Sequence, residues 1–294
     1  MRTQTGTAVH LKDYKPSDYL IDNVEMDFAL DPEATIVSTT LSMRRREGVP
    51  QDTTLSLHGD ELTLVSLAVD GRVIKEGFKA DDEGLILSAV PKSDTFVLTI
   101  VTRINPIANK KLMGLYRTSG NFCTQCEAEG FRRITYYLDR PDVLSVFKVR
   151  IEGDKQDVPL MLSNGNCIEK GDLDSGRHFA VWHDPHPKPA YLFALFAGDL
   201  GVISDSFTTM SGRDVTLEIY VEHGKEPRAL YAMDALIRSM KWDEEVYGCE
   251  YDLDIFMIVA VSDFNMGAME NKGLNIFNDK YVLADPATAT DTDY

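Results

Sequence analysis

The sequence predicts a mostly β protein with some α-structure, in which a β-rich first part precedes a smaller part that contains a helix. Short apolar segments recur at intervals of about 8–12 residues over the first two thirds of the chain, with turn-forming residues between them. Beyond residue 226, one stretch carries apolar residues at helical spacing. A strand-length apolar run, Ile255–Val261, follows it and is typical of a buried strand.

The first part alternates strand-like segments with turn signals. Val24–Leu30 alternates apolar and polar residues, and Asp31-Pro32 marks the turn that follows it. This pattern is typical of a sandwich or of an open twisted sheet. Further strands are predicted at Thr35–Met43, Leu62–Val69, Leu85–Ala89, Phe96–Thr102, Val143–Ile151, Arg177–Trp182 and Tyr191–Phe196.

The pattern changes at Gly198–Gly201, and we place a domain boundary near residue 199. This predicts an N-terminal β-domain over residues 1–199 and an incomplete second unit over residues 200–294. The second unit should contain strands at Val215–Val221, Ile255–Val261 and Leu274–Leu283.

A helix is predicted between the first two of these strands. Its apolar stripe is spaced by three, four and three residues, and consists of Leu230, Met233, Ile237 and Met240. Pro227 suits the first turn of a helix and Gly248 suits its C-terminal end.

The charge of the chain disfavours two classes of partner. The 294 residues include 30 Lys and Arg against 47 Asp and Glu, which gives a net charge of −17. Such an acidic protein is not expected to bind nucleic acid or anionic membranes. No apolar run approaches the ~20 residues that span a bilayer, and Met1–Gly6 leads into polar sequence without a secretory signal. The expected location is cytoplasmic.

Cysteines and histidines provide no recognisable metal site. Cys123 and Cys126 form a lone CxxC pair, whereas a structural zinc site would need a second pair, so we expect reduced, structural thiols. No His-Glu-x-x-His motif is present. The prolines in His183–Pro187 predict a turn whose histidines need not converge. Gly114–Gly120 lacks the Lys-Ser/Thr ending of a phosphate-binding loop, and a turn between strands is predicted there.

Two acidic residues in unusual surroundings are candidate site residues. Glu270 follows the small residues Gly267 and Ala268 after a buried strand, and small residues allow another backbone to approach closely. Glu127 lies in a second acidic stretch. If folding brought the two carboxylates together, they would suit an ammonium group, because each can make a charge-assisted hydrogen bond to it. The alternative is that both lie on unrelated surface loops.

Several stretches resemble the zinc aminopeptidases of the aminopeptidase N type, and in particular the bacterial alanyl aminopeptidase branch. Gly267–Asn271, with the sequence Gly-Ala-Met-Glu-Asn, matches the exopeptidase signature of that family. Its flanks Tyr251–Ile255 and Asn275–Asn278 also fit, as do Asn121–Arg132 and Tyr136–Asp142. The likeness covers nearly the whole chain and is strongest from about Gly114 onward.

The resemblance implies a fold and a substrate. Residues up to about 199 would form a saddle-like β-sandwich domain, and the following residues the truncated start of a thermolysin-like α+β catalytic domain. Glu270 and Glu127 would bind the free α-amino group of a peptide, which only a chain end carries. Gly267 and Ala268 would contact the substrate backbone, and Met266 and Gln125 would line the pocket for the first side chain. Met269 and Asn271 complete the implied substrate-binding set.

The resemblance also implies zinc, which activates water and polarises the carbonyl group in such enzymes. The family's His-Glu-x-x-His helix would follow the strand that ends near Leu283, so its ligands are expected beyond Tyr294. We therefore expect this chain to bind no zinc, to have no catalytic residue of its own, and to be inactive without the C-terminal part of the catalytic domain.

Other interpretations stay open at this point. The chain could be a non-catalytic peptide-binding module, or a scaffold whose acidic residues form no site. A related enzyme with added epoxide hydrolase activity belongs to the same superfamily, but the Gly267–Met269 form and the match near Cys123–Arg132 favour the bacterial peptidase.

Overall fold

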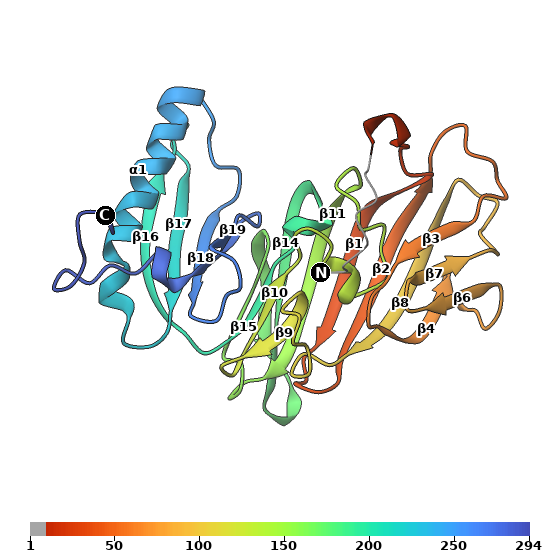
Figure 1. Cartoon of the computed structure of the whole chain (residues 1–294), viewed down its shortest axis with the longest axis horizontal. Coiled ribbons are helices and arrows are strands. Elements are labelled where there is room, and N and C mark those ends of the chain that lie inside the picture. The colour runs from red at the N-terminus through yellow and green to blue at the C-terminus, as the bar shows by residue number, and fades with distance from the viewer. Residues whose placement is uncertain (1–9) are drawn as a thin grey trace.

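A large curved sheet forms the framework of the first two thirds of the chain. The computed structural model describes residues 10–294. The sheet has eight strands in the order β13-β14-β11-β1-β2-β8-β4-β5 (Figure 1). Their bounds are β1 Tyr19–Ala29, β2 Thr35–Arg45, β4 Thr63–Val69, β5 Arg72–Val73, β8 Thr95–Ile104, β11 Leu144–Asp154, β13 Asn166–Asp172 and β14 Arg177–Pro189.

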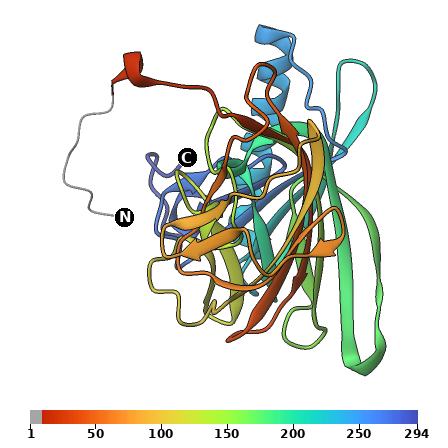
Figure 2. The same ribbon diagram turned by 90° about the vertical axis from the view of Figure 1, so that its right-hand side faces the viewer.

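One face of this sheet is buried. Side chains of β2 and β8 alternate between buried and more exposed positions, as the period of two in the sequence predicts. β1 pairs antiparallel with β2 and parallel with β11, so strands from distant parts of the sequence lie side by side. The β13–β14 hairpin extends along one side of the molecule, in green at the lower right of Figure 2.

Two smaller sheets lie within the same part of the chain. A four-stranded sheet has the order β12-β15-β10-β9, and a three-stranded sheet has the order β3-β7-β6. Short 3-10 helices connect several strands. The bounds are β3 Leu55–His58, β6 Phe78–Asp81, β7 Gly84–Leu87, β9 Gly114–Thr118, β10 Asn121–Gln125, β12 Leu160–Ser163 and β15 Leu195–Gly198, with 3-10 helices η1 Leu11–Asp13, η2 Phe131–Arg133, η3 Asp174–Gly176 and η4 Ala190–Leu192.

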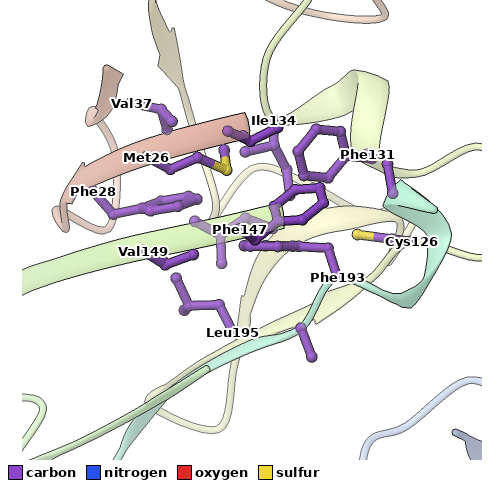
Figure 3. Close-up of a cluster of buried hydrophobic side chains, with 14 of the residues drawn as sticks. Met26, Phe28, Val37, Cys126, Phe131, Ile134, Phe147, Val149, Phe193 and Leu195 are labelled. Carbon is purple, nitrogen blue, oxygen red and sulfur yellow. The ribbon is translucent and has the colours of Figure 1, made fainter. Parts of the chain in front are cut away.

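Aromatic residues fill the space between the large sheet and the four-stranded sheet. The ring of Phe131 lies 4.8 Å from that of Tyr137, 5.2 Å from that of Phe193 and 5.9 Å from that of Phe147, measured between centroids. Figure 3 shows the rings of Phe131, Phe147 and Phe193 close together, with Cys126 beside them. All four rings are essentially inaccessible to solvent, so this cluster is a main source of hydrophobic stabilisation.

The last third of the chain forms a five-stranded sheet with one long helix on its outer face (Figure 1). The sheet order is β16-β17-β18-β20-β19, and β17, β18 and β20 run parallel. Gly248 ends the helix in the left-handed conformation, with φ at +63°. The bounds are β16 Gly201–Thr208, β17 Asp214–Val221, η5 Glu226–Ala229, α1 Leu230–Tyr247, β18 Ile255–Val261, β19 Ala268–Met269, β20 Leu274–Asn278 and η6 Asp279–Tyr281.

The strand β18 is buried on both faces, which explains its uninterrupted apolar sequence. Met257 and Val259 belong to the same hydrophobic core as the aromatic cluster. Ile258 and Ala260 face the other way and pack in a second core with Met233 of α1. The five-stranded sheet is therefore joined to the preceding sheets by a continuous core.

Several local predictions were wrong. Gly114–Gly120 is strand β9 with a turn at its end, because its residues pair with β10. His183–Pro187 lies inside strand β14, where a shift in the register with β11 accommodates the prolines. The strand predicted to reach Leu283 ends at Asn278. Leu230 of the apolar stripe is exposed, whereas Met233 and Met240 are buried as expected.

No helix within residues 10–294 has the length and apolar character needed to cross a membrane. The prediction that Met1–Gly6 is not part of a secretory signal concerns residues outside the described range. All four cysteines are free thiols: Cys123 and Cys126 are buried, and Cys167 and Cys249 are exposed.

Candidate functional site

The Glu270 segment, residues 266–271, connects strands of the five-stranded sheet. It follows β18 and contains β19, which pairs antiparallel with β20. Met269 is fully buried in the core, whereas Ala268 and Glu270 on either side of it are exposed. The backbone nitrogen of Asn278 donates to the carbonyl oxygen of Gly267 at 3.0 Å. An apolar anchor and a backbone hydrogen bond thus hold the segment and leave Glu270 accessible.

The small residues of the Glu270 segment leave its backbone accessible to another chain. β19 is the edge strand of its sheet, and Gly267 and Ala268 are both exposed. A methyl group on Gly267 would lie 3.3 Å from the ring of Tyr281, closer than most side-chain contacts. An extended peptide can add to such an edge through its own backbone groups. Met266 is 45% exposed beside the edge.

Glu127 lies in a turn formed by residues 126–130, which directly follows β10 and which we call the Glu127 turn. The nitrogen of Gly130 donates to the carbonyl oxygen of Cys126 at 2.8 Å and closes the turn. A methyl group on Gly130 would lie 2.3 Å from the carbonyl oxygen of Gln125, so the turn requires a glycine there. Glu127 itself is exposed, and its peptide bond with Ala128 is cis.

Gln125 and Asn271 each bury a side-chain oxygen that has no hydrogen-bond donor. Both residues are 1% exposed. The Gln125 amide nitrogen donates to the carbonyl oxygen of Glu127 at 3.2 Å, and that of Asn271 to the carbonyl oxygen of Met269 at 3.4 Å. Their carbonyl oxygens have no partner among the described residues. Buried polar atoms are normally paired, so these two are candidates to accept a hydrogen bond from a bound water or ligand.

The two carboxylate-bearing segments are both attached to residues 192–195. Thr124, next to Gln125, exchanges hydrogen bonds with the backbone of Leu195 through its hydroxyl group. Asn164 accepts from the nitrogen of Ala194 at 2.8 Å and donates to the carbonyl oxygen of Lys272 at 2.7 Å. Residues 192–195 thus support the chain just before the Glu127 turn and, through Asn164, the chain just after the Glu270 segment.

Glu127 and Glu270 differ from most other acidic residues in having no partner. Within residues 10–294, neither carboxylate makes an ion pair or a hydrogen bond. Their acidic neighbours do: Glu129 pairs with Arg132 at 3.3 Å, and Asp252 accepts from Lys272 at 2.5 Å. Two exposed carboxylates without counter-ions are available to a cationic ligand.

No cluster of three or more His, Cys, Asp or Glu side chains suited to a metal ion occurs within the described range. The residues present therefore do not fit a zinc ion, and no chemical step on this chain can be derived through one.

Sequence reasoning missed Asn164, which joins the two parts of the site. A single asparagine has no chemical signature, but the dipeptide Asn164-Gly165 is a turn signal, and Gly165 adopts φ at +89°. A side chain at Gly165 would lie 2.2 Å from the carbonyl oxygen of His183, which shows how closely two backbones approach there.

Two known domain families match most of the chain. The Peptidase M1 N-terminal domain matches residues 15–192, and the Peptidase family M1 domain matches residues 231–294. The chain belongs to peptidase family M1. This M1 chain is 58% identical to aminopeptidase N of Caulobacter vibrioides over 295 residues, which cover 100% of the chain and 34% of that protein. It is 53% identical to aminopeptidase N of Escherichia coli, with 99% and 33% covered.

A solved structure shows the same fold. The M1 chain superimposes on Legionella pneumophila aminopeptidase A, crystallised with aspartic acid, with a TM-score of 0.91 and 34% identity. The match covers 96% of this chain and 33% of that one. These findings confirm the family resemblance and the predicted fold class. The M1 chain spans about a third of the length of the relatives it matches.

Proposed function

We propose that this chain provides the part of a zinc-dependent aminopeptidase that binds the N-terminus of a peptide substrate. The observation that carries the proposal is the pair of exposed, unpaired carboxylates, Glu127 and Glu270, on segments whose neighbouring residues are both supported by residues 192–195. An α-ammonium group can donate a charge-assisted hydrogen bond to each carboxylate. Because only a chain end carries this group, such a site would select exopeptidase substrates.

The remaining candidate residues complete the proposed site. The exposed edge at Gly267 and Ala268 would align the substrate backbone, and the half-exposed Met266 would contact the first side chain. The buried oxygens of Gln125 and Asn271 would accept hydrogen bonds from the substrate or from bound water.

The proposal divides the parent protein into functional parts. Residues 1–199 would form the β-domain that carries Glu127, and residues 200–294 the first part of the catalytic domain that carries Glu270. Zinc and the residues that hold it would belong to the rest of the parent protein. A cytoplasmic location stays a prediction from the sequence.

Binding of an amino acid amide and of its Nα-acetyl derivative to the 294-residue chain, followed by nuclear magnetic resonance, tests the proposal. The free amine should bind more tightly. Glu127→Gln or Glu270→Gln should each weaken its binding by roughly ten- to a hundredfold, since a hydrogen bond to a charged group contributes about 1.5–3 kcal/mol. Glu129→Gln is the matched control, because Glu129 is also exposed in the same turn but is paired with Arg132. Equal binding of both compounds to the unmodified chain would refute the proposal.

The alternative of a non-catalytic peptide-binding module predicts the same dependence on the amine. The coding sequence that follows Tyr294 in the parent gene separates the two. A His-Glu-x-x-His motif within a few tens of residues would support the peptidase, whereas its absence there would favour the binding module.

A further inference from the structure

A short stretch of backbone, Leu112–Gly114, lies between the Glu127 turn and the Glu270 segment. We call it the bridging segment. Gly114 begins β9 and is the register partner of Gln125 at the end of β10. On the other side, the carbonyl oxygen of Leu112 accepts a hydrogen bond from the side-chain nitrogen of Asn265 at 3.2 Å. Since Asn265 directly precedes the Glu270 segment, the bridging segment contacts both halves of the proposed site.

Arg133 holds the bridging segment in place. Its Nε donates to the carbonyl oxygen of Met113 at 3.1 Å, and its side chain is only 6% exposed. The same carbonyl oxygen accepts from the side chain of Asn109 at 2.8 Å. A methyl group on Gly114 would lie 2.7 Å from Cβ of Arg133, and Gly114 has φ at +72°, so close contact with Arg133 depends on a glycine there.

Two carboxylates fix the orientation of the Arg133 guanidinium group. One terminal nitrogen donates to Asp60 at 2.6 Å, and the other pairs with Glu61. Lys111, just before the bridging segment, pairs with Glu61 at 2.5 Å. The nitrogen of Asp60 also donates to the carbonyl oxygen of Arg132 at 3.0 Å. A forked guanidinium group can make these separate contacts at once, which a lysine ammonium group cannot do in the same geometry.

Arg133 is also close in sequence to Glu127. It ends η2, the 3-10 helix that follows the Glu127 turn. Arg133, which follows the Glu127 turn, therefore holds the bridging segment, and the bridging segment contacts Asn265 beside the Glu270 segment.

We propose that Arg133 is a positioning residue that sets the separation between the Glu127 turn and the Glu270 segment by holding the bridging segment. This role rests on the proposed function, since it matters for activity only if both carboxylates bind one amine. Because its side chain is only 6% exposed and is bonded to Met113, Asp60 and Glu61, Arg133 would act through other residues and not on the ligand directly. Its effect passes through the carbonyl oxygens of Met113 and Leu112 to Asn265.

Amide hydrogen exchange in the 294-residue chain tests the physical part of this proposal. Arg133→Met should accelerate exchange at residues 266–270 by about tenfold or more, because it frees the bridging segment. Arg133→Lys should restore only part of the protection. Asn265→Ala breaks the other end of the connection at an exposed side chain, and should produce the same acceleration even if Arg133→Met does not fold. Arg44→Met is the control, since Arg44 makes a similar forked pair with Asp22 on the hairpin of β1 and β2.

The double variant gives the sharpest result. If both residues act through the bridging segment, the combined effect of Arg133→Met and Asn265→Ala on exchange should not exceed the larger single effect. Unchanged exchange at residues 266–270 in Asn265→Ala, or fully multiplicative effects in the double variant, would overturn the proposal.

Binding separates this proposal from the proposed function. Both single variants should lower the preference for the free amine over its acetyl derivative, while the Arg44→Met control keeps it. If the unmodified chain shows no such preference, the proposed function fails, and the exchange result still decides whether Arg133 positions the Glu270 segment. A preference that both variants retain in full would overturn the role of Arg133 in binding.

Discussion

The ammonium group of Lys188 lies 3.1 Å from the carboxylate of Asp184, and both side chains are almost completely buried. The two residues flank the shifted register in β14, where proline residues interrupt regular pairing with β11. The ammonium nitrogen also lies 4.1 Å from the ring centroid of Phe147, within the aromatic cluster. An ion pair is thus enclosed in the hydrophobic interior, where its desolvation is costly.

The fold should tolerate replacement of both members of this ion pair, but not of Lys188 alone. Lys188→Met alone should lower the free energy of unfolding by about 3–5 kcal/mol, because it leaves the Asp184 carboxylate buried without a counter-ion. The double variant Asp184→Leu with Lys188→Met should be as stable as the unmodified chain, or more stable by about 1–4 kcal/mol. Urea unfolding of the three proteins checks this, and a double variant less stable than Lys188→Met would contradict it.

Glu61 should affect stability in the acid range. Hydrogen bonds from Arg133 and Lys111 lower the pKa of Glu61 from 4.5 to about 2. Its contribution is therefore present above pH 4.5 and is lost as the pH falls through 2. Glu61→Gln should cost no more than about 1 kcal/mol at pH 7, because the side chain is 55% exposed and screened by solvent. The difference from the unmodified chain in urea unfolding should shrink from pH 4.5 downward; a difference that stays constant to pH 2 would exclude this origin.

Gly130→Ala should distort the Glu127 turn. The backbone of Gly130, with φ at −86°, is allowed for alanine, so the expected cost comes from backbone clashes. The added methyl group would lie 2.3 Å from the Gln125 carbonyl oxygen, 2.8 Å from Cα of Cys126 and 3.0 Å from the nitrogen of Gly114. Overpacking of this kind costs about 1–3 kcal/mol, and the displaced turn should also bind the free amine more weakly. Gly120→Ala is the comparison: it has open space around it but φ at +85°, so it should affect stability alone. An unchanged amine affinity in Gly130→Ala would contradict the prediction.

Phe131→Ala should be among the most destabilising single substitutions, because Phe131 touches three other rings. The loss of its buried surface and the cavity left behind should cost about 3–5 kcal/mol. Ile86→Ala, at a side chain that is 41% exposed, should cost well under half as much in the same urea titration. Similar costs at both positions would mean that the aromatic cluster does not dominate this part of the core.

Periodicity predicted the long strands and the helix well, because their side chains alternate between buried and exposed positions with a fixed period. β1, β2, β8 and α1 are examples. Sequence reasoning failed where tertiary pairing decides the structure. Gly114–Gly120, which contains β9, was predicted as a turn because glycines bound it. In the structure Gly114 leaves room for Arg133, since a side chain on Gly114 would clash with Cβ of Arg133.

The candidate site residues were predicted from a sequence motif, but the residues that hold them in place could not be predicted from the sequence. Glu270 lies in a recognisable pentapeptide, and Glu127 in an acidic stretch that resembles the same family. Asn164, Arg133 and Asn265 act through hydrogen bonds to backbone atoms far away in sequence. Such contacts impose no local pattern, so a single sequence does not reveal them.

The parallel pairing of β1 with β11 has a consequence for synthesis on the ribosome. Arg150 of β11 pairs with Asp27 of β1, which is 123 residues earlier in the chain. At roughly 5–20 residues per second, about 6–25 seconds pass between the translation of these two residues. During this interval the nascent hairpin of β1 and β2 has an uncovered edge that other chains can join. Newly made copies are therefore expected to need a chaperone before residue 154 leaves the ribosomal tunnel, and the finished chain much less so.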